Sequence, residues 1–232
     1  MLPHVDDNRT QYRLNLSYHA GEITEYCEPA AMECYRGTIQ IAKDLCIAHP
    51  LVRAKGEKSA PWRMTTDCVV TLRQPGHSRV LLALSFKSDP LRLISSRDRK
   101  KLAIEREYWM CQGHEWLLIT PEVYDSAVAE ALERSYGWAM GPIASSDYCE
   151  EAAHVVKASR YVTLQQAYNL VSASLQCDLS QAQKVFWQAV WGGLLPIDLR
   201  HTLWVTNLLR HISLDEFQDA NPVSARRSAW IT

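Results

Sequence analysis

The chain has 232 residues, which is enough for one large domain or for a medium-sized domain followed by a small one. Apolar residues make up 47% and charged residues 22%, an ordinary balance for a folded protein that excludes disorder along the whole chain. The formal net charge is -1, which excludes binding of nucleic acid by bulk positive charge, so any contact with nucleic acid must be local.

The first predicted elements are a strand and a helix. Residues 5–16 alternate polar and apolar side chains, as an extended strand does. Residues 29–47 carry apolar side chains at helical spacing, although Gly37 interrupts the pattern and Thr38 can begin a new helix. Pro50 ends this helix, because proline disfavours the helical conformation of the residue before it.

A hairpin, a helix and a further strand follow. The strands are residues 65–72 and 79–86, and residues 73–77 carry the turn signal between them. Residues 96–112 have the apolar pattern of a helix, and residues 116–120 form a short apolar run that is typical of a buried strand. This order predicts an α/β fold in which a sheet is flanked by helices.

The C-terminal part predicts a small helical domain. Residues 121–136 predict a helix and residues 141–149 a loop, and capping-box patterns at Thr163 and Asp178 each open a further helix. Two short extended segments follow, at 194–197 and 203–206. Two helices and a β-ribbon are the outline of a winged helix. The predicted domains are residues 1–150, a winged-helix domain at 160–220 and a frayed tail at 221–232.

The helix after Asp178 carries Phe186, Trp187 and Trp191 among glutamines. The side chains that could read bases stand among these aromatic ones in a part of the chain with no net charge, so the pattern favours contact with protein over strong reading of DNA. They are Gln181, Gln183, Lys184 and Gln188. An exposed aromatic stripe would be a partner surface, and the alternative is that these aromatic side chains fill a small core.

The sequence carries no signal for membrane insertion or secretion, and its cysteines do not form a recognisable framework. The longest apolar run, residues 80–84, is far too short to span a membrane, and the first thirteen residues lack the apolar core of a signal peptide. The seven cysteines include no C-x-x-C pair, which indicates thiols in a reducing cytoplasm rather than a disulfide framework or a zinc site.

The predicted hairpin carries the residues that suggest chemistry. Ser85 and Lys87 share a face of one strand, and the neighbouring strand can bring Asp67 beside them. An acid on one strand and a lysine on the next is the pattern of metal-dependent nucleases of the restriction-enzyme type. Phosphodiester hydrolysis uses Mg²⁺ held by oxygen ligands, and a nearby lysine stabilises the developing charge. Asp67 and the backbone carbonyl of Phe86 are the expected metal ligands.

Several stretches occur in one order along the chain and together resemble a known family. They are VDDNRTQYRL from Val5, IQIAKDLCIAHP from Ile39, MTTD from Met64, SFK from Ser85 and KLAIEREYW from Lys101. In this order they resemble the TnsA subunit of heteromeric cut-and-paste transposases. The resemblance extends over nearly the whole chain and is strongest over residues 5–120.

The resemblance implies a Mg²⁺-dependent endonuclease with a restriction-endonuclease-like domain and a C-terminal winged helix. It implies Asp67 as the metal-binding acid, Lys87 as the active-site lysine and Phe86 as a carbonyl ligand. Ser85 stands where the family usually has a glutamine, and we expect this shorter side chain to reach the metal through a water. The implied partners are the DNA of transposon ends, a TnsB-type transposase that cuts the 3′ ends while TnsA cuts the 5′ ends, and a TnsC-type ATPase.

The resemblance also implies an active-site glutamate on a helix before the segment that begins at Val5, which would precede Met1. Either the start of the chain is placed too late, or the chain is a decayed copy that acts as a non-catalytic scaffold in the same complex. The glutamates that could substitute are Glu22, Glu25, Glu28 and Glu33.

The helix at 96–112 adds two candidates. Glu105 either supports the active-site lysine from behind or forms an ordinary salt bridge on the helix surface. A group of basic residues either contacts DNA phosphates or forms a solvated helix face. This group is Arg97, Arg99, Lys100, Lys101 and Arg106.

Overall fold

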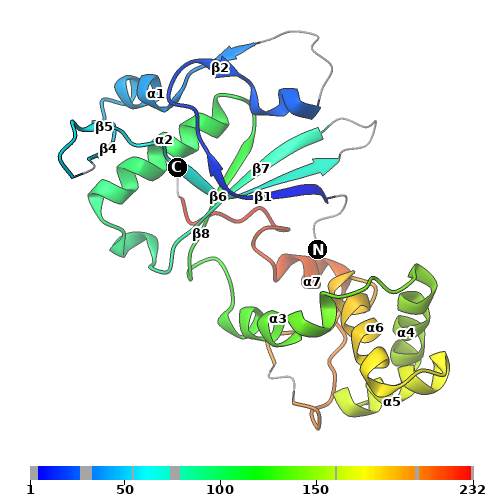
Figure 1. The fold of residues 1–232 in the computed structure, drawn as a ribbon. Coiled ribbons are helices and arrows are strands. Elements are labelled where there is room, and N and C mark those ends of the chain that lie inside the picture. Colours follow the sequence, from blue (N-terminus) through cyan, green and yellow to red (C-terminus); the bar gives the residue numbers. More distant parts are fainter. Residues whose placement is uncertain are drawn as a thin grey trace. The chain divides into compact units, whose positions relative to one another are not determined.

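A computed structural model describes residues 5–26, 33–53, 55–73, 79–159, 161–201 and 204–230. The chain divides into two compact units (Figure 1). The sheet unit comprises residues up to 123 together with 227–232, and the helical unit comprises residues 124–226. The boundary differs from the expected one at residue 150, because a helix at Ser126–Ala139 and a helix at Ser146–Ala158 both pack in the C-terminal core.

A four-stranded mixed sheet forms the centre of the sheet unit, in the order β1-β6-β7-β8. The strands β1 and β6 are antiparallel, as are β6 and β7, whereas β8 runs parallel to β7. The predicted strands are therefore confirmed, and the turn residues 74–77 lie outside the described part of the chain. The bounds are β1 Val5–Arg13, β6 Thr65–Arg73, β7 Arg79–Phe86 and β8 Glu115–Ile119.

The predicted helix at 96–112 is confirmed as α2 (Ser96–Met110), which begins where the Ser95 hydroxyl accepts a hydrogen bond from the Asp98 backbone N–H. Its side chains Leu102, Tyr108 and Trp109 are buried against the sheet in one hydrophobic core. This burial fixes α2 over one face of the sheet (Figure 1) and so fixes which of its other side chains face the strand ends.

The helix predicted at 29–47 begins only at Thr38, as α1 (Thr38–Asp44), and residues 27–32 lie outside the described chain. A Cβ added at Gly37 would lie 2.3 Å from the carbonyl oxygen of Ser17, so only glycine allows the chain to pass there. The prediction was wrong for residues 33–37, where this close approach holds the chain extended. The remaining short elements are β2 His19–Ala20, η1 Glu22–Tyr26, β3 Cys34–Tyr35, β4 Leu51–Val52, β5 Ala60–Pro61 and η2 Leu91–Leu93.

The expected frayed tail is wrong for residues 227–230, which pack on β8. Ala229 donates its backbone N–H to the carbonyl of Leu118 (2.8 Å), and the Leu118 N–H donates to the Ser228 hydroxyl (3.0 Å). Ala229 is only 6% exposed, and the ring of Trp230 meets Trp116 edge-on. The tail is ordered because β8 is an edge strand whose free backbone groups and apolar side chains need cover.

The helical unit contains five α-helices among its described residues. The Thr163 capping box is confirmed, whereas at Asp178 the side chain accepts from the Gln181 N–H without the reciprocal bond that a capping box needs. The segment expected as a loop includes the start of a helix capped by Ser145. No helix in the described ranges is long and apolar enough to cross a membrane. The bounds are α3 Ser126–Ala139, α4 Ser146–Ala158, α5 Leu164–Leu175, α6 Leu179–Trp191 and α7 Leu214–Asp219.

The aromatic side chains of α6 form core rather than an exposed stripe. Phe186 and Trp187 are buried, and the Trp187 indole N–H donates to the Tyr168 hydroxyl (2.9 Å). The expected β-ribbon is represented, within the described residues, by isolated bridges from Thr163 to Leu208 and from Ile197 to His211. A winged helix is therefore not confirmed for this unit.

The packing of the tail on β8 leads to a prediction for Ser228→Ala. The substitution leaves the Leu118 N–H without its acceptor. We therefore expect the free energy of local opening at β8 to fall by about 1–3 kcal/mol. Hydrogen exchange at the Leu118 amide measures this directly and should become faster.

Ser224→Ala is the matched control, because the Ser224 hydroxyl is buried without a partner in the described structure. It should leave exchange at Leu118 unchanged. Equal exchange rates in the two variants would show that the tail does not hold the edge of β8.

Candidate active site

The strands β6 and β7 bring the predicted acid and lysine together. Cys68 pairs with Leu84, so Asp67 lies opposite the end of β7, where Phe86 and Lys87 follow. The Phe86 backbone N–H donates to Oδ2 of Asp67 (2.8 Å), and Nζ of Lys87 lies 3.8 Å from the same oxygen. Nζ also donates to the Phe86 carbonyl (3.0 Å). A carboxylate, a carbonyl and an ammonium group thus meet at one point.

Helix α2 supplies a further acid to this point. Asp98, Lys101, Leu102 and Glu105 recur at three- and four-residue spacing and so share one face of the helix. All four line a cavity of about 150 Å³ together with Asp67 and Lys87. Asp98 is already paired with Lys101 (2.6 Å), which leaves Asp67 and Glu105 as the facing carboxyl groups.

Glu105 lies in a buried and hydrogen-bonded position. It is 5% exposed and accepts a hydrogen bond from the Ser85 hydroxyl (2.6 Å). The pKa of Glu105 is raised to about 7, mainly by burial and also by the charge of Asp67, although hydrogen bonds from Ser85 and Thr66 and the charge of Lys87 act in the opposite direction. A surface salt bridge, one of the two expected roles, does not describe this residue.

Ser85 orients Glu105 in this structure. The indole N–H of Trp116 donates to the Ser85 hydroxyl (3.0 Å), which in turn donates to Glu105. Ser85 is 1% exposed. Its proton and one of its two acceptor lone pairs are thus used inside the protein.

The oxygen donors fit a divalent cation such as Mg²⁺. No group of three or more His, Cys, Asp or Glu side chains with the spacing of a metal site occurs in the described ranges. Mg²⁺ nevertheless needs only one or two protein carboxylates, since water and substrate phosphates complete its shell. Asp67, Glu105 and the Phe86 carbonyl supply such a set. A cation bound between Glu105 and Asp67 would also offset the repulsion between these two carboxyl groups, which contributes to the raised pKa of Glu105.

Gln11 is a site residue that the sequence patterns did not reveal. Its side-chain amide donates to Oδ1 of Asp67 (3.2 Å), and its carbonyl oxygen accepts from the Thr65 hydroxyl (3.2 Å). Its φ of 50° lies in the left-handed region, which is uncommon for a residue inside a strand. The only signal in the sequence is its place on the predicted first strand, opposite Asp67.

Among the glutamates considered as substitutes, the two whose side chains are described lie elsewhere. Glu22 accepts hydrogen bonds from Tyr12, Tyr108 and Asn15 in a buried polar cluster. Glu33 accepts one from a neighbouring tyrosine. Neither lines the cavity at Asp67. The side chain of Glu25 and all of Glu28 lie outside the described residues.

Four of the five predicted basic residues on α2 divide into two parts. Arg97, Lys100 and Lys101 line a hollow of about 460 Å³ beside residues 47–51. Arg99 instead donates to the carbonyls of Leu91 (2.6 Å) and Ile94 (3.3 Å) and so holds the chain before α2. The fifth, Arg106, lines neither this hollow nor the Asp67 cavity.

The raised pKa of Glu105 predicts a pH effect on stability. Its pKa rises from a usual value near 4.5 to about 7, so between these values the folded protein binds more protons than the unfolded chain. Stability therefore falls as pH rises through this window, by on the order of 3 kcal/mol for this residue.

Glu105→Gln should remove this loss, and urea denaturation across the window in a metal chelator measures it. Glu107→Gln, a partly exposed acid on the same helix, is the control and should keep the wild-type dependence. If Glu105→Gln and the wild type lose stability equally as pH rises, the pH dependence does not come from Glu105.

The comparison with known proteins agrees with this geometry. A family model described as the N-terminal domain of TnsA-like endonucleases matches residues 3–121, which include the whole sheet, α2 and every residue that lines the cavity. A search of curated proteins found no match. The mixed sheet flanked by helices is a restriction-endonuclease-like fold. This chain belongs to the TnsA-like endonuclease family.

Proposed function

We propose that this chain is the DNA-cleaving subunit of a heteromeric transposase and hydrolyses phosphodiester bonds at the 5′ ends of a transposon with Mg²⁺. The observation that carries the proposal is the meeting of Asp67, Lys87 and Glu105 around one cavity. The match to the TnsA-like endonuclease domain supports DNA as the substrate.

The residues have distinct tasks in this proposal. Asp67, Glu105 and the Phe86 carbonyl would hold Mg²⁺, which polarises the phosphate and lowers the pKa of a bound water. The Phe86 N–H and the Gln11 amide fix the Asp67 carboxylate from two sides. Lys87 places a positive charge 3.8 Å from Asp67, where it can stabilise charge that develops on the phosphate oxygens.

The partners belong to the same proposal. The family resemblance implies a TnsB-type transposase that cuts the 3′ ends and a TnsC-type ATPase. Cleavage by this chain is then expected inside that complex, on DNA that carries the transposon ends.

A second candidate function is a non-catalytic scaffold in the same complex. The observation that favours it is the small set of metal donors. The described residues hold no cluster of three or more metal-binding side chains, and the Ser85 hydroxyl already bonds to Glu105 and Trp116. The scaffold needs the fold but not Asp67 or Lys87.

Substitution at the two hairpin residues separates these functions. In a reaction reconstituted with both partners, we expect Asp67→Asn and Lys87→Met each to reduce 5′-strand cleavage by roughly 100-fold or more, because each removes a group that stabilises the transition state. Strand-specific end-labelling measures this while 3′ cleavage continues.

Asp89→Asn and Lys43→Met remove exposed charges outside the cavity and are the controls. If neither the wild type nor the variants cut 5′ strands while 3′ cleavage proceeds, the scaffold function is correct.

Metal binding can be tested apart from cleavage. Because a cation at Asp67 and Glu105 favours the ionised carboxylates, Mg²⁺ should raise the thermal stability of the wild type more above the pKa of Glu105 than below it. The gain approaches about 3 kcal/mol at a hundredfold excess over the dissociation constant. Differential scanning calorimetry measures it.

Asp67→Asn should abolish this gain, and Asp89→Asn should retain it. A gain that is equal in all three proteins, or equal at both pH values, would place the cation somewhere else.

A further inference from the structure

We propose that the hairpin β4–β5 and the first half of α2 form one basic surface that carries the phosphate backbone of duplex DNA toward the Asp67 cavity. This inference rests on the proposed function, because it assigns the path of that function's substrate. We call the surface the basic track and define it by Lys55, Lys58, Arg63, Arg97, Lys100 and Lys101.

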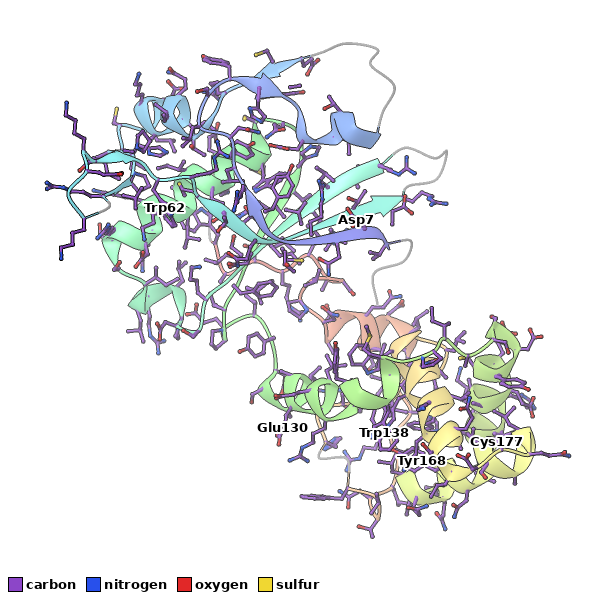
Figure 2. All side chains as sticks on the ribbon, viewed as in Figure 1. Asp7, Trp62, Glu130, Trp138, Tyr168 and Cys177 are labelled. Carbon is purple, nitrogen blue, oxygen red and sulfur yellow. The ribbon has the colours of Figure 1, made fainter. Side chains whose placement is uncertain are left out.

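The hairpin part of the track is strongly basic in a chain whose net charge is slightly negative. Residues 51–63 contain four basic residues and one acid, Glu57, whose carbonyl accepts a hydrogen bond from Arg53 (2.9 Å). Lys55, Lys58 and Arg63 are exposed and make no ion pair with the described residues. Figure 1 shows β4 and β5 projecting beside α2, and Figure 2 shows long side chains with nitrogen tips extending there.

The helix part of the track lines a hollow in which Arg97 and Lys100 remain exposed to solvent. Arg97, Lys100 and Lys101 lie three and four residues apart, and all three line the hollow of about 460 Å³ whose other wall includes Pro50 and Leu51. Arg97 and Lys100 form no close ion pair within the described ranges, although the charge of Arg97 also acts on the neighbouring Asp98. No acid lines this hollow, and although Lys101 is paired with Asp98, Arg97 and Lys100 can donate charge-assisted hydrogen bonds to phosphate oxygens there.

Trp62 and Lys101 connect the track to the cavity. Lys101 lines both hollows, and its Nζ lies 5.5 Å from the centre of the Trp62 ring. The Trp62 backbone N–H donates to the Pro50 carbonyl (2.9 Å), which holds the ring at the base of the hairpin (Figure 2). Trp62 also lines the Asp67 cavity and is 38% exposed. Lys101 and Trp62 therefore join the hairpin and the helix part of the track to the cavity.

The spread of charge favours a polymer over a small anion. The six cations are distributed along a hairpin and more than one turn of a helix, whereas a single phosphate would need them around one point. A DNA backbone presents phosphates at regular intervals and binds in proportion to the number that are neutralised. The other polymer with such spacing is an acidic segment of a partner protein, which the experiment below distinguishes.

The test is equilibrium binding of a fluorescent DNA duplex of mixed sequence, in a chelator, over a series of salt concentrations. Two double variants of the full chain are compared with the wild type, Lys55→Ala/Lys58→Ala and Arg97→Ala/Lys100→Ala. We expect each to weaken binding by roughly tenfold or more and to reduce the salt slope by about 2, one unit for each lost phosphate contact. Lys43→Ala/Arg92→Ala removes two exposed charges of the sheet unit outside both hollows and should bind as the wild type does.

Unchanged affinity and salt slope in both double variants would overturn the inference. Variants that bind DNA normally but fail in the reconstituted reaction would also overturn it, since the surface would then serve an acidic partner. Binding is measured without metal, so a wild type that binds DNA through the track yet never cleaves it would retain this inference and reject the nuclease function. Matching far-ultraviolet circular dichroism confirms that the variants are folded.

Discussion

The pairing register of β6 against β7 is the constraint on which the rest of the site depends. Because side chains alternate between the faces of a sheet, a slip of one residue would turn Asp67 to the opposite face and move it away from Lys87. The buried pair Val69 and Ala83 belongs to the core under α2 and so penalises any such slip. The hydrophobic core therefore sets the position of the reactive groups.

Stability and chemistry oppose each other around Glu105. Two tryptophan N–H groups, from Trp116 and Trp109, donate to the hydroxyls of Ser85 and Thr66 beneath the cavity, so this floor of polar groups is satisfied although it is buried. Burying the Glu105 carboxyl group above this floor costs free energy, which the packing of the surrounding core must offset. Such a cost is typical of functional sites, where a group is held in the state that the reaction needs.

Local patterns in the sequence were sufficient for the hairpin and the approach of Asp67 to Lys87, which strand alternation and a short turn determine, and for α2, which the helical spacing of its apolar side chains indicates. They could not assign Glu105, because its burial depends on how α2 lies over the sheet. Helix α4 was missed because its buried face consists mostly of small side chains such as Ala152 and Ala153, which give a weak apolar signal. Gln11 was missed because its contact with Asp67 joins residues 56 positions apart.

The return of residues 227–230 to the edge of β8 makes the helical unit an insertion within the sheet unit. During synthesis the ribosome completes the sheet, then the whole of the helical unit, and only then the segment that covers β8. The nascent sheet unit thus presents an open strand edge for the time that about a hundred residues take to be made, roughly 5–20 s at ordinary elongation rates. This is the interval in which mispairing of β8 with another chain competes most directly with correct folding.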